Sequence, residues 1–478
     1  MVGIVVDQLR TDYIELLSSR FGERGFKTLL QDGVYMRDVD FKAARLDAAS
    51  ATAMIATGAY PSQTGVPAAA VYDPSVAGSA MKLPLVASSS NSITNDSFTP
   101  KALRLSTVGD ELVVETAGKA GVYSVAADPQ QAVILAGHAG RGAYWINNSS
   151  GNWATTSYYG PLPSALNTRN MRRSLAQRVD TMQWRKYRFS RQDRDVYKKF
   201  IASPLANAEV TDVAIDLIAD LNLGTRPGET DMLNVAYSLA PYKYAADYVS
   251  REEEAEAYLR LDSQIGRLID AVDRRVGTAN SVIYITSTGY YSEALPPDEK
   301  YRIPGGEFSA KRARSLLNSY LSARFGSAGY VSAIRDGQIY FDRHAIESMR
   351  LDPSAVISEA RAFLVKMDGV AEAFTIDEVL SPSTAETESL RLSADPRHAG
   401  DIIIRFNPGW KIQYDEQLPV QSDYARESAV MTPVLIRAPG LKPKVIPETV
   451  DAVRIAPTIS RLLNIRAPNG ARSGALPF

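Results

Sequence analysis

The chain has 478 residues, of which 45% are hydrophobic and 22% charged, a composition typical of a large globular protein. Its formal net charge of -1 and the lack of long runs of like charge argue against a nucleic-acid-binding protein. There are no cysteines, which excludes disulfides, thiolate nucleophiles and zinc–thiolate sites. The three histidines, His138, His344 and His398, lie far apart, which is unusual for a hydrolase with two zinc ions.

No apolar stretch reaches the roughly 18 residues that a transmembrane helix needs, so none is predicted. Met1 leads directly into an apolar segment, without the charged and apolar regions of a signal peptide. We therefore expect that a leader preceded this sequence.

Segments with strand and helix patterns alternate along the chain. The apolar run Val2–Val6 predicts a buried parallel strand that ends at Asp7. Residues 72–97 are predicted to be irregular, and 146–159 to form a hairpin with its turn at 148–151. Helices are predicted over 11–17, 25–31, 105–120, 210–221, 252–274, 311–323 and 450–464, and further strands over 34–41, 121–126, 132–136, 231–238, 281–286, 338–341, 401–406 and 434–436.

This alternation predicts an α/β fold with a mostly parallel central sheet and helices on both faces. Two segments interrupt the rhythm and are predicted to be inserted caps. The expected organisation is a first core part at 1–73, an inserted cap at 74–210, a second core part at 211–300, a second insertion at 301–400 and a last core part at 401–478.

A stretch rich in small residues, from Asp47 to Gly58, follows the first strand. In an α/β protein, a strand-end carboxylate beside a helix start is a place for a metal and a nucleophile. Asp47, Ser50 and Thr52 are candidate nucleophiles there, but no histidine or cation lies near them in the sequence to activate them. We therefore favour capping of the helix start as their role.

Several ordered motifs extend along most of the chain. They are Gly3-Ile-Val-Val-Asp7-Gln8-Leu9-Arg10, Thr57-Gly58 with Pro61-Ser62, Gly137-His138 with Ala143-Tyr144-Trp145, Tyr258-Leu-Arg-Leu-Asp262, Pro304-Gly305-Gly306, Gly400-Asp401-Ile402 with Pro408-Gly409-Trp410, and Ile455-Ala456-Pro457-Thr458. In these motifs the chain resembles the alkaline phosphatase superfamily, in the branch of the phosphate-insensitive periplasmic alkaline phosphatases and the nucleotide pyrophosphatase/phosphodiesterases. The resemblance implies an alkaline-phosphatase-like fold.

Members of this family hold two zinc ions with about six Asp and His ligands and attack phosphorus with a Thr or Ser alkoxide. Matched motif by motif, the first-strand aspartate is retained as Asp7, and the nucleophile position is Ala48. The remaining family ligand positions carry other residues: Pro241, Ala245, Thr288, Gly289 and, by spacing, Ser422. The phosphate-contacting motifs fall on 68–71 and 128–130 and lack the family's residues.

The resemblance, with these replacements, predicts a pseudo-enzyme without a cofactor, its zinc site lost. It would act as a binding or scaffold subunit of an extracytoplasmic assembly, with an unknown protein partner in an envelope complex. The resemblance implies a periplasmic or outer-membrane-associated location. Two alternatives remain open: an active phosphomonoesterase or phosphodiesterase with a metal site rebuilt around Asp7 and Asp47, and a non-catalytic binder of a small ligand in the remnant cleft.

Other polar residues have ordinary structural interpretations. For Asp7 we favour capping of the adjoining helix over a vestigial ligand role. His138 is predicted to be structural, His344 solvated, and His398 a weak metal candidate. Five tyrosines flank the former metal positions: Tyr237, Tyr242, Tyr244, Tyr290 and Tyr291. They either fill the vacated pocket or form a surface for a ligand or partner, for which Tyr242, Tyr244, Tyr290 and Tyr291 are the candidates.

Overall fold

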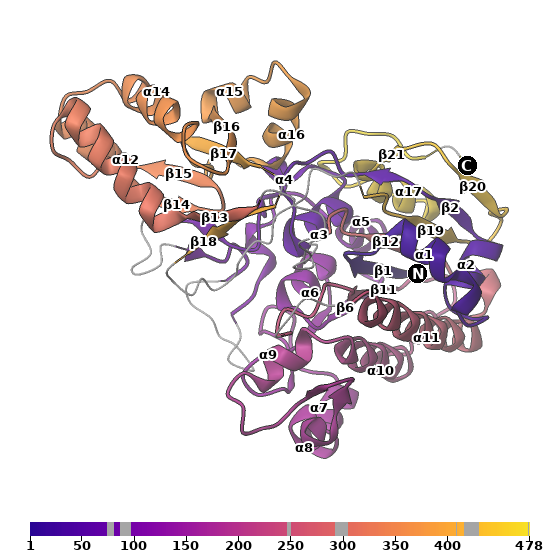
Figure 1. Ribbon diagram of the computed structural model, residues 1–478. Helices are drawn as coiled ribbons and strands as arrows, with labels where there is room; N and C mark the ends of the chain where they lie inside the picture. The colour runs from indigo at the N-terminus through magenta and orange to yellow at the C-terminus, as the bar shows by residue number, and fades with distance from the viewer. Residues whose placement is uncertain are drawn as a thin grey trace.

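The structure is a computed structural model that describes residues 1–73, 81–86, 97–245, 250–291, 305–407, 409–414, 430–476 and 478. Its centre is a sheet of nine strands in the order β20-β2-β19-β12-β1-β11-β6-β7-β8 (Figure 1). The strands are β1 (Val2–Asp7), β2 (Val34–Met36), β6 (Val122–Ala126), β7 (Gly142–Ile146), β8 (Trp153–Ala154), β11 (Met232–Ser238), β12 (Ile283–Ser287), β19 (Val434–Arg437) and β20 (Lys444–Ile446).

The sheet is parallel in its middle and mixed towards its edges. β1 lies between β11 and β12 and is parallel to both, and β11, β6 and β7 continue in the same direction. β19 runs antiparallel to β12 and β2, and β8 runs antiparallel to β7. The predicted α/β class with a mostly parallel sheet is confirmed.

Helices cover both faces of the sheet, as the apolar strands require. One face is covered by α3 (Ala48–Thr57), α5 (Val108–Glu115), α6 (Pro129–Ala136) and α17 (Ile455–Leu462). The other carries α1 (Thr11–Leu17), α2 (Phe26–Asp32), α10 (Leu205–Asp220) and α11 (Arg251–Arg275).

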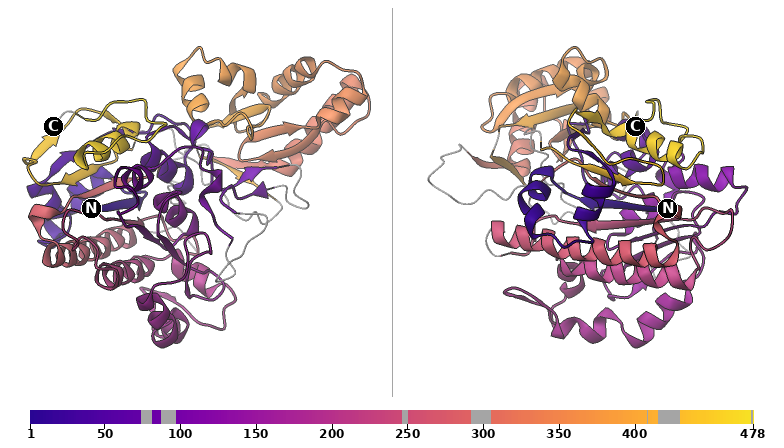
Figure 2. Two further views of the ribbon diagram at one scale, coloured as in Figure 1. Left: turned by 180° about the vertical axis from the view of Figure 1, so that it is seen from behind. Right: turned by 90° about the vertical axis from the view of Figure 1, so that its right-hand side faces the viewer.

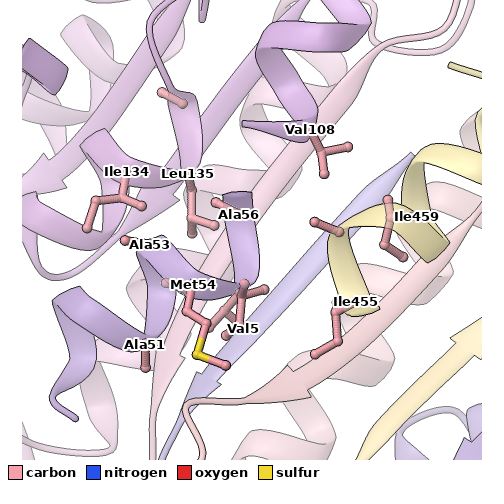
Figure 3. Close-up of a cluster of buried hydrophobic side chains, with 14 of the residues drawn as sticks. Val5, Ala51, Ala53, Met54, Ala56, Val108, Ile134, Leu135, Ile455 and Ile459 are labelled. Atoms are coloured by element: carbon pink, nitrogen blue, oxygen red, sulfur yellow. The ribbon is translucent and has the colours of Figure 1, made fainter. Parts of the chain in front are cut away.

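The side chains of β1 alternate between the two cores. Val5 belongs to the first, whereas Val2, Ile4 and Val6 belong to the second. Figure 3 shows Val5 among residues of α3, α5, α6 and α17. The small residues of α3 let this buried helix approach both the sheet and α6, and nine of its ten residues are buried.

A second unit projects from this core (Figure 2). It has a four-stranded sheet in the order β14-β15-β17-β16, made by β14 (Val331–Arg335), β15 (Gln338–Phe341), β17 (Ile402–Phe406) and β16 (Val370–Thr375). The strands β13 (Gly306–Ser309) and β18 (Trp410–Gln413) pair beside it, and its helices are α12 (Ala310–Phe325), α13 (Arg343–Ser348), α14 (Pro353–Leu364), α15 (Ile376–Leu380) and α16 (Ala385–Ser393).

The remaining elements are short. The strands are β3 (Val39–Asp40), β4 (Val71–Tyr72), β5 (Met81–Lys82), β9 (Gln183–Trp184), β10 (Tyr187–Arg188) and β21 (Val450–Asp451). The α-helices are α4 (Pro61–Thr64), α7 (Ser164–Arg172), α8 (Leu175–Arg178) and α9 (Val196–Ile201), and 3-10 turns span Ser18–Arg20, Pro100–Ala102, Val179–Thr181, Thr278–Asn280 and Ala452–Arg454.

Two predicted boundaries need correction. The segment 74–210 is not wholly an inserted cap, because β6, β7 and β8 lie in the central sheet. The predicted break between residues 400 and 401 divides the second unit, because β17 completes its sheet. In both cases a strand pairs with partners distant in sequence, which a change in local pattern does not reveal.

One predicted strand is a helix. Residues 132–136 belong to α6, which begins at Pro129, and the Asp128 carboxylate accepts hydrogen bonds from the amides of Gln130 and Gln131. An aspartate cap followed by proline in the first turn is a helix-start signal. The apolar run alone does not separate a buried strand from a buried helix.

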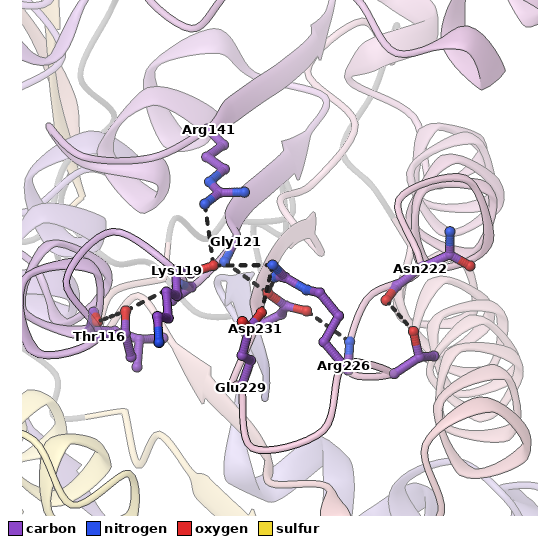
Figure 4. A network of polar contacts seen from close by, with 12 residues as sticks. Thr116, Lys119, Gly121, Arg141, Asn222, Arg226, Glu229 and Asp231 are labelled. Carbon is purple, nitrogen blue, oxygen red and sulfur yellow. Dashed lines mark hydrogen bonds and ion pairs between the residues drawn. The ribbon is translucent and has the colours of Figure 1, made fainter.

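A polar network closes the edge of the sheet where the parallel strands begin. The buried Asp231 carboxylate accepts hydrogen bonds from the amides of Gly121 at 2.8 Å and Gly224 at 2.9 Å and pairs with Arg226 (Figure 4). These contacts tie the start of β6 to the loop between α10 and β11. The functional candidates lie at the opposite edge.

Candidate active site

The carboxyl ends of the central strands meet around Asp7. This residue ends β1 and pairs with Ser238 at the end of β11, while Val6 pairs with Ser287 at the end of β12. Asp128 follows β6, the next strand beyond β11. In open α/β sheets, this edge is where ligands bind.

The Asp7 carboxylate is held by two hydroxyl groups from the turn after β12. Thr288 Oγ1 donates to Asp7 Oδ1 at 2.9 Å, and Tyr290 Oη donates to the same oxygen at 2.8 Å. Asp7 Oδ2 has a more distant neighbour, Ser238 Oγ at 3.5 Å. The capping interpretation of Asp7 is wrong, because α1 begins after Arg10 without a side-chain cap.

Burial raises the pKa of Asp7 to about 6. Hydrogen bonds from Tyr290 and Thr288 lower this pKa, while the negative charges of Asp47 and Asp128 raise it further. The Asp7 carboxyl group therefore exchanges its proton close to neutral pH. The pKa of Tyr290 is raised well above its ordinary value, mainly by burial, so its hydroxyl group keeps its proton.

The start of α3 forms a capping box. Asp47 Oδ1 accepts from the Ser50 amide at 2.9 Å, and the Asp47 amide donates to Ser50 Oγ at 3.0 Å. The Thr52 hydroxyl donates to the carbonyl oxygen of Ala48. The capping interpretation of Asp47 and Ser50 is confirmed, and Ala48, at the first helical position, carries only a methyl group.

Asp128 adds a negative charge near Asp7, and Lys243 in turn acts on Asp128. Burial raises the pKa of Asp128, while the amides of Gln131 and Gln130 and the positive charge of Lys243 lower it. Lys243 lies in the loop after β11, and its ammonium group is 5.6 Å from the centre of the Tyr244 ring. Lys243 was not predicted as a site residue, although its position between Tyr242 and Tyr244 was an available signal.

Packing fills the space beside Gly289, a position predicted to match a family ligand. Gly289 has φ +76°, and a Cβ atom there would lie 2.1 Å from Phe41 Cδ2. A side chain at 289 therefore requires both a strained backbone and a displaced Phe41 ring. Ala245 packs beside the Trp184 and Tyr242 cluster, Pro241 precedes it in the same loop, and Ser422 lies outside the described residues.

The predicted tyrosine group separates into distinct places. Tyr290 contacts Asp7, whereas the Tyr291 hydroxyl donates to Glu254 at 2.5 Å. Tyr242 and Tyr244 pack together with Trp184 and Tyr187, and Tyr237 is buried against Thr211. Of the five tyrosines, Tyr290 is hydrogen-bonded to Asp7. That any of the others binds a ligand or a partner stays a prediction.

The three histidines have different surroundings in the structure. His344 is exposed on α13, as predicted. His398 Nδ1 lies 3.2 Å from Asp395, whose carboxylate is also paired with Arg104. His138 contributes a carbonyl oxygen that accepts a hydrogen bond from Tyr158.

The residues that the structure describes do not fit the zinc pair of the family. Within these residues, no three His, Asp or Glu side chains are grouped so as to hold a metal ion. At two positions predicted to match family ligands, Thr288 directs its hydroxyl group to Asp7, and Gly289 has no side chain. The loss of the full family ligand set stays a prediction, since Ser422 is not described.

Known proteins match the chain along most of its length. The family model of type I phosphodiesterase / nucleotide pyrophosphatase matches residues 1–430. Alkaline phosphatase PafA of Elizabethkingia meningoseptica is 26% identical over 98% of this chain and 92% of that protein. Alkaline phosphatase PhoV of Synechococcus elongatus is 26% identical over 98% of this chain and 91% of that protein. The crystal structure of wild-type PafA covers 100% of this chain and 98% of its own, with a TM-score of 0.86 and 24% identity.

These matches overturn conclusions drawn from the replaced side chains. The expected pseudo-enzyme and scaffold role is wrong, because PafA and PhoV, two relatives that match along nearly the whole chain, are named as alkaline phosphatases. The expectation that the protein has no cofactor is wrong too. The chain matches alkaline phosphatases along its length, and its resemblance to that superfamily implies zinc. The chain belongs to the type I phosphodiesterase / nucleotide pyrophosphatase family.

Proposed function

We propose that this protein hydrolyses phosphoesters at the edge of the sheet around Asp7. One observation supports this proposal most directly. Asp7 is retained at the end of β1, and among its described hydrogen-bond partners the nearest to Oδ2 is Ser238 Oγ, at 3.5 Å. Family membership and full-length alkaline phosphatase relatives support the reaction class.

The attacking group in this proposal is water. Ala48 has no hydroxyl group, so a phosphoryl-enzyme cannot form at that position. The neighbouring hydroxyl groups of Ser50 and Thr52 donate to Asp47 and to the Ala48 carbonyl oxygen. Direct attack by water is a single displacement and inverts the configuration at phosphorus, whereas a covalent intermediate retains it.

Asp7 is the base in this reaction. Above a pH of about 6 its carboxylate is ionised and can accept a proton from water at Oδ2. Tyr290 and Thr288 fix the carboxylate through Oδ1, which orients the other oxygen. Proton transfer to a base with this pKa suits turnover at neutral pH.

The charges favour diesters over monoesters as substrates. Asp7, Asp47 and Asp128 act on one another electrostatically, and Lys243 is the cation that acts on Asp128. A phosphodiester brings one negative charge to this region, whereas a monoester brings nearly two near neutral pH. Like charges repel, so the monoester pays the larger electrostatic penalty.

Hydrolysis of bis-p-nitrophenyl phosphate and p-nitrophenyl phosphate, with zinc, magnesium or manganese supplied, tests this function. We expect turnover of the diester to exceed that of the monoester and to be lost in Asp7→Asn. Asp352→Asn is the matched control, because Asp352 caps α14 in the second unit and asparagine also caps helices. Background turnover of both substrates by the unmodified protein would reject the proposal.

We also propose an extracytoplasmic location, in the periplasm or associated with the outer membrane. The resemblance and the alkaline phosphatase relatives support it. Within the described residues, no helix is long and apolar enough to cross a membrane. A protein partner in an envelope complex stays a prediction; fractionation and mild purification test both.

A further inference from the structure

Lys243 lies in the loop that follows β11. The amide of Ala245 donates to the Tyr242 carbonyl oxygen at 3.1 Å, so Lys243 is held within a tight turn. The strand before this loop ends beside Asp7, because the Leu239 amide donates to the Asp7 carbonyl oxygen at 2.9 Å. The loop therefore leaves the sheet at the edge where Asp7 lies.

Buried aromatic side chains anchor this turn. Tyr242 is 5% exposed, and its ring centroid lies 4.7 Å from that of Tyr187 and 5.5 Å from that of Trp184. The Lys243 ammonium group lies 5.6 Å from the centre of the Tyr244 ring, a distance at which a cation is attracted to the ring. The anchor and the ring together limit the region in which the ammonium group lies.

The charge of Lys243 is not neutralised, unlike that of a neighbouring lysine. Lys198, which acts electrostatically on Tyr244, has its Nζ 2.9 Å from Asp195. Lys243 is exposed and, within the part of the chain that the structure describes, forms no ion pair or hydrogen bond. Its N–H donors are therefore free to bind an acceptor from outside the protein.

The carboxylates around Asp7 make this cation relevant to the site. Asp47 and Asp128 both place negative charge near Asp7, and Lys243 is the cation that acts on Asp128. These carboxylates repel an anionic substrate, and a nearby cation offsets that repulsion. One ammonium group matches the single negative charge of a phosphodiester, and lysine binds phosphate oxygens as a compact point charge.

An exposed lysine is ordinarily a solvated surface group. Lys243 differs in two respects, because a buried anchor holds its turn and because it acts on a buried carboxylate of the site. We propose that the Lys243 ammonium group binds a non-bridging oxygen of the phosphodiester substrate and so favours singly charged esters. This inference rests on the proposed hydrolysis at the Asp7 edge.

Steady-state hydrolysis of bis-p-nitrophenyl phosphate by Lys243→Ala tests the proposal. Because the ion pair forms in the ground state as well as in the transition state, we expect KM to rise about tenfold and kcat to change less than about twofold. Lys243→Arg should restore most of the affinity, since it keeps the positive charge. Added salt should raise the KM of the unmodified protein more steeply than that of Lys243→Ala, because salt screens the attraction that the variant lacks.

Lys198→Ala is the matched control, because it removes the same charge from a nearby lysine that Asp195 already neutralises. Its KM should stay within about twofold of the unmodified value. An unchanged KM in Lys243→Ala, an equal rise in both variants, or a loss of kcat at constant KM would overturn the proposal.

Equilibrium binding of diphenyl phosphate, measured by calorimetry in Asp7→Asn, separates this proposal from the proposed function. Asp7→Asn removes a negative charge, so it should not weaken the binding of an anion. Adding Lys243→Ala should weaken binding about tenfold, whereas adding Lys198→Ala should not. If the unmodified protein hydrolyses no diester but this pattern holds, the proposed function fails and the role of Lys243 stands. No binding to Asp7→Asn, or binding that does not depend on Lys243, would overturn that role.

Discussion

Tyr290 donates its phenolic hydrogen to Asp7 across 2.8 Å and so joins the turn after β12 to the end of β1. The two residues are 283 positions apart in the chain. With Thr288, which donates to the same carboxylate oxygen, Tyr290 occupies one side of Asp7 and leaves the other oxygen more open.

The first prediction concerns Tyr290→Phe, which removes one donor to Asp7. Because that hydrogen bond lowers the pKa of Asp7, its loss should raise this pKa above about 6. The acid limb of the pH–rate profile for diester hydrolysis should move to higher pH. Tyr291→Phe is the control, since Tyr291 bonds Glu254; an unmoved limb in Tyr290→Phe would contradict the role given to this hydrogen bond.

The second prediction concerns the stability cost of Asp7. Its pKa rises from the ordinary 3.8 to about 6 on folding, so between these values the folded state binds more protons than the unfolded state. The free energy of unfolding therefore falls as pH rises through this window, by about 3 kcal/mol in total. Above it, the loss is complete.

Asp7→Asn should remove this dependence, because an amide does not ionise and its oxygen still accepts from Tyr290. Urea unfolding at pH 4 and pH 8 measures the effect. We expect the variant to gain stability relative to the unmodified protein at the higher pH. A difference that is the same at both pH values would show that Asp7 ionises normally.

These contacts mark the limit of what could be predicted from the sequence. The apolar run before Asp7 specified a buried central strand, because such runs suit a parallel strand covered on both faces. The bond from Tyr290 depends on how β12 and its turn are placed beside β1, which no local pattern encodes. The motifs predict that position 289 matches a family ligand. Only the packing reveals that Phe41 occupies the space that a side chain would need there.

The third prediction is that Gly289→Ala destabilises the fold. Two costs add: a positive φ of +76° and a Cβ contact of 2.1 Å with Phe41. Strain and overpacking of this kind cost about 1–3 kcal/mol each. Gly118→Ala is the control, because Gly118 has φ +80° with nothing within 4 Å, so it reports the backbone cost alone. If urea unfolding shows that Gly289→Ala and Gly118→Ala lose the same free energy of unfolding, the Phe41 ring moves aside without cost.

The fourth prediction follows from the methyl group at Ala48. Hydrolysis of a chiral phosphorothioate diester in labelled water should invert the configuration at phosphorus, since water attacks directly. Mass spectrometry of the acid-quenched protein should find no added phosphoryl group. Retention of configuration, or a phosphorylated residue, would replace water with a side-chain nucleophile.

The most direct measurement is the rate of bis-p-nitrophenyl phosphate hydrolysis by the purified protein and by Asp7→Asn, with each divalent metal. If phosphoesters are hydrolysed at the Asp7 edge of the sheet, the unmodified protein should show rates above background with each metal tested. Asp7→Asn should show only background rates. Equal rates for the two proteins, whether at background or above it, would contradict hydrolysis at that edge.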